Sequence, residues 1–211
     1  MRITKYEHAC FVVEIGGKKL VVDPGSFTVP LPDNNNVVGI VVTHEHGDHW
    51  SLEQLQRILA ASPDAKLYGP AGVAAAASDF DFAVVSSGDV IELDPFRLEF
   101  FGEKHAQIHS SIPLVDNVGV LINDSVFYPG DSFTLPPADV ELLAVPASAP
   151  WLKIGEVMDY VIAAKPKRSF PTHEMINSVV GNGMANARIE ALTQQGGGEF
   201  FPLAPGESVE I

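Results

Sequence analysis

Cysteine and basic residues are scarce in this chain, and each shortage narrows what the protein can be. Its 211 residues include one cysteine, Cys10, which excludes an internal disulfide and a disulfide-stapled scaffold. Only 13 lysines and arginines stand against 27 aspartates and glutamates, which gives a formal net charge of −14 at pH 7. Such a surface repels phosphate backbones and anionic lipid headgroups. We therefore expect a small-molecule substrate, and neither nucleic acid nor a membrane as a partner.

Long apolar runs are also missing, although hydrophobic residues make up 46% of the chain. No run approaches the roughly 20 residues that a membrane-spanning helix requires. Residues 1–8 hold no apolar leader segment, which together with the single cysteine predicts a cytoplasmic protein. The length and the apolar content suit one globular domain over residues 1–211. The sequence leaves open whether the chain forms a homo-oligomer.

What the chain does contain is a segment dense in metal-ligand side chains, Thr43-His44-Glu45-His46-Gly47-Asp48-His49-Trp50. It follows the apolar run 37–42, whose length and β-branched residues predict a buried strand. Ser51 and Gln54 then form a capping-box pattern, which predicts the start of a helix. The ligand-type side chains should therefore lie at the carboxyl end of a strand, where α/β folds place their chemistry.

The spacing of these four ligand-type residues favours two metal ions over one. A single tetrahedral ion cannot easily take all four side chains and keep a position for water. His44 and His46, at alternate positions, can face one ion, while Asp48 and His49 can face a second. We expect Gly47 between the pairs to let the backbone bend sharply. A polar loop with surface histidines is the plainer alternative, and this density of ligands after a buried strand disfavours it.

The pattern His44-x-His46-x-Asp48-His49 resembles the signature of the metallo-β-lactamase-fold hydrolases. Other segments resemble pieces of the same family in the expected order over nearly the whole chain, namely Asp23 at a strand end, an isolated histidine at His105 or His109, Asp131 in Pro-Gly-Asp-Ser, and His173 after Pro-Thr. With Glu7-His8-Ala9, these segments look most like the small branch that includes ascorbate-phosphate lactonase. The resemblance implies an α/β fold (α+β in some schemes) of the four-layer αββα sandwich type, with helices on both outer faces.

The resemblance also implies a ligand set for two divalent ions. One ion would take His44, His46 and His105, the other would take Asp48, His49 and His173, and Asp131 would bridge them. His105 is favoured over His109 because it lies directly past the expected strand 96–102. The nitrogen-rich ligands favour zinc, and manganese and iron are compatible with them.

Five further residues are expected around the ligands. Asp23 would orient a ligand or anchor the ligand loop, and its alternative is a turn cap. His8 and His109 would support a ligand or line the pocket, and the alternative for His8 is a structural role. Trp50 and Trp151 would form an apolar wall of the pocket, with packing into the core as the alternative.

The implied activity is the hydrolysis of a small-molecule ester or lactone by a hydroxide held between the two ions, with Asp48 as a catalytic carboxylate that handles a proton. A phosphodiesterase of the same fold is the main alternative. A di-iron redox relative usually has glutamate in the place of His46, which disfavours that class. A catalytically inactive binding protein is disfavoured because every expected ligand type is present.

Hydrophobic periodicity predicts the remaining elements. Three antiparallel strands are expected over residues 2–23, with a turn at Gly16-Gly17. Helices are expected over residues 51–61, 71–77, 153–164 and 184–194. The helix 153–164 should bury a face made of Ile154, Val157, Met158, Val161 and Ile162.

Overall fold

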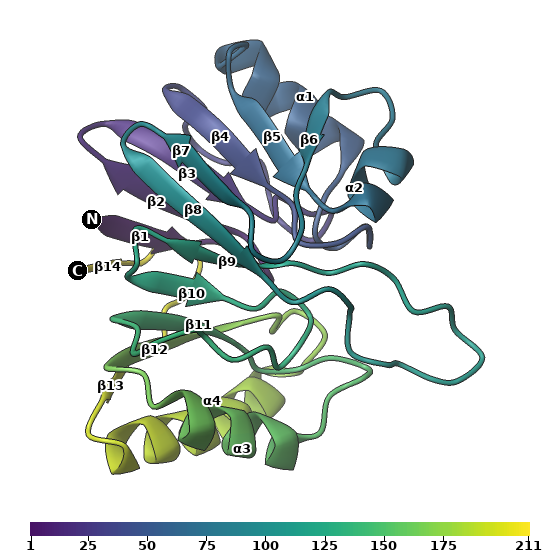
Figure 1. Ribbon diagram of the computed structural model, residues 1–211. Helices are drawn as coiled ribbons and strands as arrows, with labels where there is room; N and C mark the ends of the chain where they lie inside the picture. The colour runs from purple at the N-terminus through teal and green to yellow at the C-terminus, as the bar shows by residue number, and fades with distance from the viewer.

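Two seven-stranded sheets pack face to face in the computed structural model, which describes residues 1–211 (Figure 1). The first sheet has the strand order β14-β1-β2-β3-β4-β5-β6. Its strands are β1 (Arg2–Lys5), β2 (Phe11–Ile15), β3 (Lys18–Val22), β4 (Val37–Val41), β5 (Lys66–Gly69), β6 (Phe82–Val84) and β14 (Ser208–Glu210). Helices α1 (Leu52–Ala61) and α2 (Ala71–Ala76) cover its outer face (Figure 1).

The second sheet has the strand order β13-β12-β11-β10-β9-β8-β7. Its strands are β7 (Val90–Leu93), β8 (Phe96–Phe101), β9 (Gly119–Ile122), β10 (Val126–Tyr128), β11 (Leu142–Pro146), β12 (Arg168–Thr172) and β13 (Glu199–Phe200). Helices α3 (Ile154–Ala164) and α4 (Val179–Gln195) cover its outer face (Figure 1). The expected four-layer αββα sandwich is therefore confirmed. Each of these helices is too short or too polar to cross a membrane.

The largest group of buried apolar side chains lies between the two sheets. Both sheets contribute to it: the rings of Phe11 on β2 and Phe170 on β12 meet with their centroids 5.8 Å apart. Two further clusters lie between each sheet and its helices, one including Leu55 and Ile58 of α1 and the other Val157 of α3. Fully burying one such side chain stabilises the fold by roughly 1.5–3 kcal/mol. Burial on both faces explains why the central strands are nearly continuous apolar runs.

Parallel strands bring several segments to one edge of the sandwich. β3 is parallel to β4 in the first sheet, and β10, β11 and β12 are parallel neighbours in the second. The carboxyl ends of parallel neighbours lie at the same edge of a sheet. This edge therefore collects Asp23 after β3, the segment 43–50 after β4, Asp131 after β10, Ser148 after β11 and His173 after β12.

Two details of the helices differ from the expectations. α4 begins at Val179 rather than at residue 184, because the Ser178 side chain accepts a hydrogen bond from the backbone N–H of Gly181 and caps the helix there. The predicted buried face of α3 is only partly right. Val157 and Val161 are buried, but Ile154 is 41% exposed and Ile162 is 47% exposed. Instead of these two isoleucines, the helix buries Tyr160 and Ala164.

The segment between β8 and β9 projects from the molecule as a long loop (Figure 1). Backbone hydrogen bonds close its base, from the His105 N–H to the Val115 carbonyl and from the Asn117 N–H to the Glu103 carbonyl, both at 3.1 Å. Residues 105–115 contain no lysine, arginine, aspartate or glutamate. The loop therefore holds His105 at its closed base, while His109 lies on its exposed part.

Candidate metal centre

Three histidines from two loops form the first group of ligand-type side chains. His44, His46 and His105 place their candidate ligand atoms within 4.8 Å of one another. The Nε2 atom of His44 lies 3.1 Å from Nδ1 of His46. His109 lies outside this group: it is exposed, and its Nδ1 is 2.7 Å from the Ser111 hydroxyl. Of the two histidines that competed for this role, the structure thus brings His105 to the group.

A second group joins the ligand loop to the segment after β12. Asp48, His49 and His173, together with His8, place candidate ligand atoms within 4.8 Å of one another. Oδ2 of Asp48 lies 3.5 Å from Nε2 of His173 and 4.0 Å from Nε2 of His49. The two groups have the same membership as the two predicted ligand sets, except that His8 is added to the second.

Asp131 lies between the two groups and touches both. Its Oδ2 is 3.3 Å from Nε2 of His105 in the first group and 3.1 Å from Nε2 of His173 in the second. Its Oδ1 is 3.3 Å from Nε2 of His49. Trp151 donates its indole N–H to the same carboxylate at 2.9 Å. One buried carboxylate thus connects the two groups, which is the position that a bridging ligand needs.

Gly130 allows the backbone conformation that brings Asp131 to this position. Gly130 has a φ of +64°, and a Cβ atom there would lie 2.4 Å from Oδ1 of Asn117 and 2.9 Å from Cβ of Thr43. Oδ1 of Asn117 instead accepts a hydrogen bond from the Asp131 backbone N–H at 3.0 Å. Any larger residue at 130 would displace this support.

Unpartnered buried atoms test whether the site fits metal ions. Nε2 of His49, His105 and His173 and Oδ1 of Asp131 are buried and accept or donate no hydrogen bond. The Nδ1 atoms of the three histidines face acceptors: the Asp23 carboxylate at 2.7 Å, the Ala106 carbonyl at 2.5 Å and the Ser148 carbonyl at 2.5 Å. Donation from Nδ1 leaves the Nε2 lone pair directed at the centre. Each unsatisfied buried group costs about 1–3 kcal/mol, and divalent ions would satisfy all four, so the residues fit metal.

Asp23 holds ligands of both groups in place. Its buried carboxylate accepts hydrogen bonds from the Thr43 N–H at 2.8 Å, the Thr43 hydroxyl at 2.7 Å and Nδ1 of His49 at 2.7 Å. Because the Thr43 hydroxyl donates to Asp23, its oxygen can accept from Nδ1 of His44, which is 3.1 Å away. The carboxylate therefore orients His49 directly and His44 through Thr43, as outer partners of metal ligands do.

His8 supports Asp48 instead of completing a ligand set. Its ring is fully buried, and its Nδ1 accepts the Met175 backbone N–H at 3.3 Å. The hydrogen of the neutral ring is then on Nε2, which donates to Oδ2 of Asp48 at 3.1 Å. Burial lowers the pKa of His8, so the neutral form is favoured at pH 7. The His8 carbonyl also accepts the His173 N–H at 2.9 Å, which joins the start of the chain to the end of β12.

The close backbone approach in the ligand loop occurs at Gly25 and not at Gly47. The backbone does turn at Gly47, where the His49 N–H donates to the His46 carbonyl at 3.0 Å. Gly47 has no positive φ, however, and a Cβ atom there would meet nothing within 4 Å, so this turn does not require glycine. A Cβ atom on Gly25 would lie 1.8 Å from the Asp48 carbonyl oxygen. The Ser26 N–H donates to the Gly47 carbonyl at 2.8 Å and fastens the two loops together. The Pro24-Gly25 dipeptide predicts a turn at this position. It does not predict that the Asp48 carbonyl packs against that turn.

Trp50 and Trp151 lie in different surroundings, one against the apolar core and the other against the candidate ligands. Trp151 contacts Asp131 and stacks edge-on to His105, with ring centroids 5.8 Å apart. Trp50 donates its N–H to the Glu45 carbonyl at 2.9 Å and packs against the apolar cluster under α1. Only Trp151 therefore reaches the centre, while Trp50 has the core-packing role that was its alternative.

A Trp151→Phe substitution should weaken metal binding without unfolding the protein. Phenylalanine keeps an aromatic ring against Phe133, whose ring centroid is 5.2 Å from that of Trp151, but loses the hydrogen bond to Asp131. Loss of an outer partner of a ligand typically costs ~10–100-fold in metal affinity, and we expect the lower end here. Zinc affinity measured by competition with a chelator tests this, with Trp50→Phe as the matched control that should leave the affinity unchanged. Equal affinities in the two variants would contradict the role given to Trp151.

The histidines and carboxylates of the metal-free centre balance one another's charge. Burial lowers the pKa of His173, but the Asp131 and Asp48 carboxylates more than compensate and raise it to about 9. Burial also lowers the pKa of His49, and Asp131 and Asp23 raise it well above its ordinary value. Burial raises the pKa of Asp131, while His49 and His173 bring it well below its usual range. Without metal, the raised pKa values keep His49 and His173 protonated on nitrogens that would bind the ions. Metal binding should therefore release protons.

Metal-free protein should therefore lose stability as the pH rises. The pKa of His173 is about 9 in the folded state against an ordinary value of 6.5, so its stabilisation is complete below pH 6.5 and disappears as the pH rises through 9. The expected loss is on the order of 3 kcal/mol. Urea unfolding of chelator-treated and zinc-loaded protein between these two pH values measures it, and the zinc-loaded protein should change much less. A constant unfolding free energy in the metal-free protein would refute the charge balance.

A family model and several curated proteins match the sequence of this chain. A family model described as "Beta-lactamase superfamily domain" matches residues 2–173. The protein Rv0786c of Mycobacterium tuberculosis is 33% identical over 99% of this chain and 98% of its own length. A UPF0173 protein of Pyrococcus furiosus is 32% identical over 82% of this chain and 83% of its own. A UPF0173 metal-dependent hydrolase of Flavobacterium johnsoniae is 43% identical over a shorter stretch, 23% of this chain and 24% of its own.

Solved structures share the fold at low sequence identity. Igni18, a metallo hydrolase from Ignicoccus hospitalis, superimposes with a TM-score of 0.74 and 17% identity over 99% of this chain and 97% of its own. The metallo-beta-lactamase fold protein YhfI from Bacillus subtilis has a TM-score of 0.73 and 16% identity over 99% of each chain. CmlA, a diiron beta-hydroxylase from Streptomyces venezuelae, has a TM-score of 0.69 and 14% identity over 100% of this chain and 54% of its own. Because the same fold appears in an oxidative enzyme, the fold alone does not determine the reaction.

Proposed function

The chain belongs to the β-lactamase superfamily of metal-dependent hydrolases, and on this premise we propose that it cleaves an ester or lactone bond in a small molecule with two divalent metal ions, zinc first among them. The observation that carries the proposal is the pair of ligand groups joined by Asp131, with buried nitrogens that lack any other partner. Manganese and iron suit nitrogen and carboxylate ligands too, so zinc is the first metal to test.

The proposal gives each ligand a place. His44, His46 and His105 would hold one ion, Asp48, His49 and His173 the other, and Asp131 would contact both. When bound, such ions lower the pKa of water toward ~7 and polarise the carbonyl under attack. Trp151 and Asn117 support the bridging carboxylate, and Asp23 keeps the histidine rings in the orientation that leaves Nε2 free.

Asp48 is the carboxylate best placed to move a proton. Its side chain is 24% exposed, whereas that of Asp131 is 4% exposed. A carboxylate at the solvent side can accept a proton and pass it to water, while the buried one is held by hydrogen bonds and by charge. The hydrogen bond from His8 fixes the orientation of Asp48 for this role.

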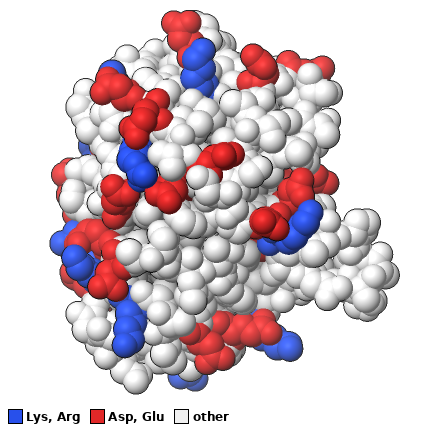
Figure 2. All heavy atoms as spheres, in the orientation of Figure 1, with Lys and Arg blue, Asp and Glu red and all other residues white.

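A small molecule suits the surface better than a polymer does. The formal net charge is −14, and acidic side chains are spread over the face seen in Figure 2, with no gathering of basic ones. A nucleic-acid backbone would be repelled by such a face. A small anion can still reach the centre, because two bound divalent ions would make it locally positive. The lactone part of the proposal rests on the likeness of Glu7-His8-Ala9 and the other short segments to the lactonase branch.

A substrate panel combined with metal analysis tests the proposal. Protein purified without chelator should hold close to two transition-metal ions per chain by elemental analysis. Zinc-loaded protein should hydrolyse members of a panel of lactones and carboxylic esters, and chelator-treated protein should not. Efficient cleavage of phosphodiesters, with no turnover across the lactones and esters, would replace the proposal by a phosphodiesterase. Protein that binds no zinc at micromolar concentration would refute the metal centre itself.

A further inference from the structure

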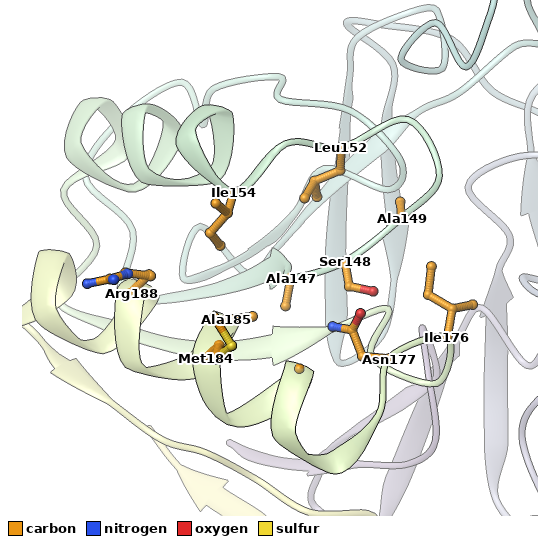
Figure 3. A pocket seen from close by; sticks show the side chains of 11 residues that line it. Ala147, Ser148, Ala149, Leu152, Ile154, Ile176, Asn177, Met184, Ala185 and Arg188 are labelled. Atoms are coloured by element: carbon orange, nitrogen blue, oxygen red, sulfur yellow. The ribbon is translucent and has the colours of Figure 1, made fainter.

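A cavity of about 410 Å³ lies between the N-terminal parts of α3 and α4 and has no role in the site described so far (Figure 3). Eleven residues line it, seven of them hydrophobic. Its volume falls in the range of small-molecule sites, roughly 300–1,000 Å³. The wall contributed by α4 runs from Gly181 to Arg188, a length of roughly 10 Å at 1.5 Å per residue.

The inner end of this cavity is built from the segments that hold His173. Ser148 lines the cavity, and its carbonyl accepts the hydrogen bond from Nδ1 of His173. Its hydroxyl oxygen is buried and has no hydrogen-bond partner. Asn177 lines the same end, and Figure 3 shows the polar ends of the two side chains turned toward each other. This polar end of the cavity therefore adjoins the backbone segment that supports His173.

The middle of the cavity is apolar and partly open. Leu152, Ile154 and Met184 line it, and Ile154 is 41% and Met184 67% exposed. Ile154 is one of the side chains that were expected to be buried by α3. Apolar surface left open beside a polar site is typical of a ligand pocket, where covering it is worth about 25 cal/mol per Å².

The far end carries a positive charge that no carboxylate of the protein neutralises. Arg188 lines the cavity, and in Figure 3 its guanidinium lies at the end opposite Ser148 and Asn177.

 Arg188 has no acidic side chain within 4.0 Å, unlike nine other basic residues, which are Arg2, Lys5, Lys18, Lys19, Arg97, Lys104, Lys153, Lys167 and Arg168. Arginine pairs well with a carboxylate or a phosphate.

We propose that this cavity binds the part of the substrate that does not react, an apolar acyl chain that ends in an anionic group. The bond to be cleaved would lie beside His173, the chain would run along Ile154 and Met184, and its anionic end would meet Arg188. The inference rests on the proposed function, because it assumes that hydrolysis takes place at the metal centre. It adds a substrate class, an ester or lactone of an acyl chain with a distal negative charge.

Binding of product-like acids tests the cavity without relying on turnover. Zinc-loaded protein is titrated calorimetrically with acetate, octanoate and suberate, which share a carboxylate but differ in the chain and in the distal charge. Octanoate should bind more tightly than acetate, and suberate more tightly than octanoate. Arg188→Gln should remove the advantage of suberate, roughly 5-fold for an exposed ion pair, and leave octanoate unchanged. Arg57→Gln, which changes an arginine of α1 outside the cavity, is the matched control.

A second pair of variants tests the apolar wall. Met184→Glu places a carboxylate in the apolar wall and should weaken octanoate binding by roughly 10-fold. Binding would either strip water from this carboxylate or leave part of the octanoate chain exposed to water, and both are unfavourable. Val179→Glu is the control: it lies on the same helix, is 89% exposed and does not line the cavity. Zinc content and thermal unfolding should be the same in both variants. An effect of Met184→Glu alone supports the proposal.

The outcomes separate this inference from the proposed function. Equal affinities for the three acids would overturn the cavity assignment, even if the protein hydrolyses esters. The expected ranking, together with no hydrolysis of any ester or lactone, would keep the acid-binding cavity and refute the proposed reaction. If both glutamate variants convert a dimer into a monomer and neither changes octanoate binding, a second copy covers this face and the inference is wrong.

Discussion

His105→Ala is expected to abolish turnover and to empty the first ligand group of its metal ion. The substitution removes one of three histidines in that group and also the nitrogen that lies 3.3 Å from Asp131. Loss of an outer partner of a ligand already costs ~10–100-fold, so loss of the ligand itself should cost at least ~100-fold in kcat/KM. Elemental analysis after dialysis should find about one metal ion fewer per chain than in the unmodified protein.

His109→Ala is the matched control for this experiment. His109 lies on the same projecting loop and is exposed, and its ring has hydrogen-bond contacts only with Ser111. Its removal should leave the metal content unchanged, and circular dichroism should show both variants folded. Metal loss in His109→Ala, with a normal metal content in His105→Ala, would reverse the assignment.

The second large effect is expected for Asp23→Ala, on stability. The carboxylate is fully buried and accepts three hydrogen bonds from Thr43 and His49. Its removal leaves buried donors without acceptors, and breaking such a buried pair typically costs 3–5 kcal/mol, so we expect a loss of about 3–5 kcal/mol in the free energy of unfolding. Urea unfolding of the metal-free proteins measures this loss. Asp64→Ala, an exposed aspartate with no ion pair, should stay within about 0.5 kcal/mol.

Asp23→Asn separates stability from metal binding. Asparagine keeps the size of the side chain and an oxygen that can accept the Thr43 N–H. Its amide group presents hydrogens toward Nδ1 of His49, which favours the tautomer with the hydrogen on Nε2, where the metal should bind. This variant should therefore lose less stability than Asp23→Ala and still lose zinc affinity by ~10–100-fold. Normal zinc affinity in Asp23→Asn would contradict the orienting role of this carboxylate.

Much of the fold could be predicted from local sequence patterns. The turn at Gly16-Gly17, the apolar run that forms β4, and the Ser51 cap of α1 act between residues close in the chain, and all three are present in the structure. The ligand loop is also local, because four ligand-type residues within six positions must share one loop wherever it lies. These patterns, together with the resemblance to the family, predicted the αββα sandwich and placed His44, His46, Asp48 and His49 in one loop at the carboxyl end of a strand.

The choices that the sequence left open depended on packing between distant segments. His105 and His109 are equivalent as residue types, and only the closed base of the projecting loop directs His105 to His44 and His46. His8 is assigned to Asp48 by a backbone N–H that lies 167 positions away in the chain. In the same way, Gly25 is required because Asp48 packs against it.

In the helices, too, local sequence predicted the elements, while tertiary packing decided which side chains they bury. Periodicity predicted helices over residues 153–164 and 184–194, and the resemblance implied helices on both outer faces. Neither could tell which apolar side chains would meet the sheet and which would remain open to line a cavity. That outcome depends on how the helices are rotated against the sheet and on where Ser178 starts α4. Local patterns determine which elements form, because they act through neighbouring backbone groups and side chains. The tertiary structure decides which side chains meet, because those contacts arise only when both sheets are packed together.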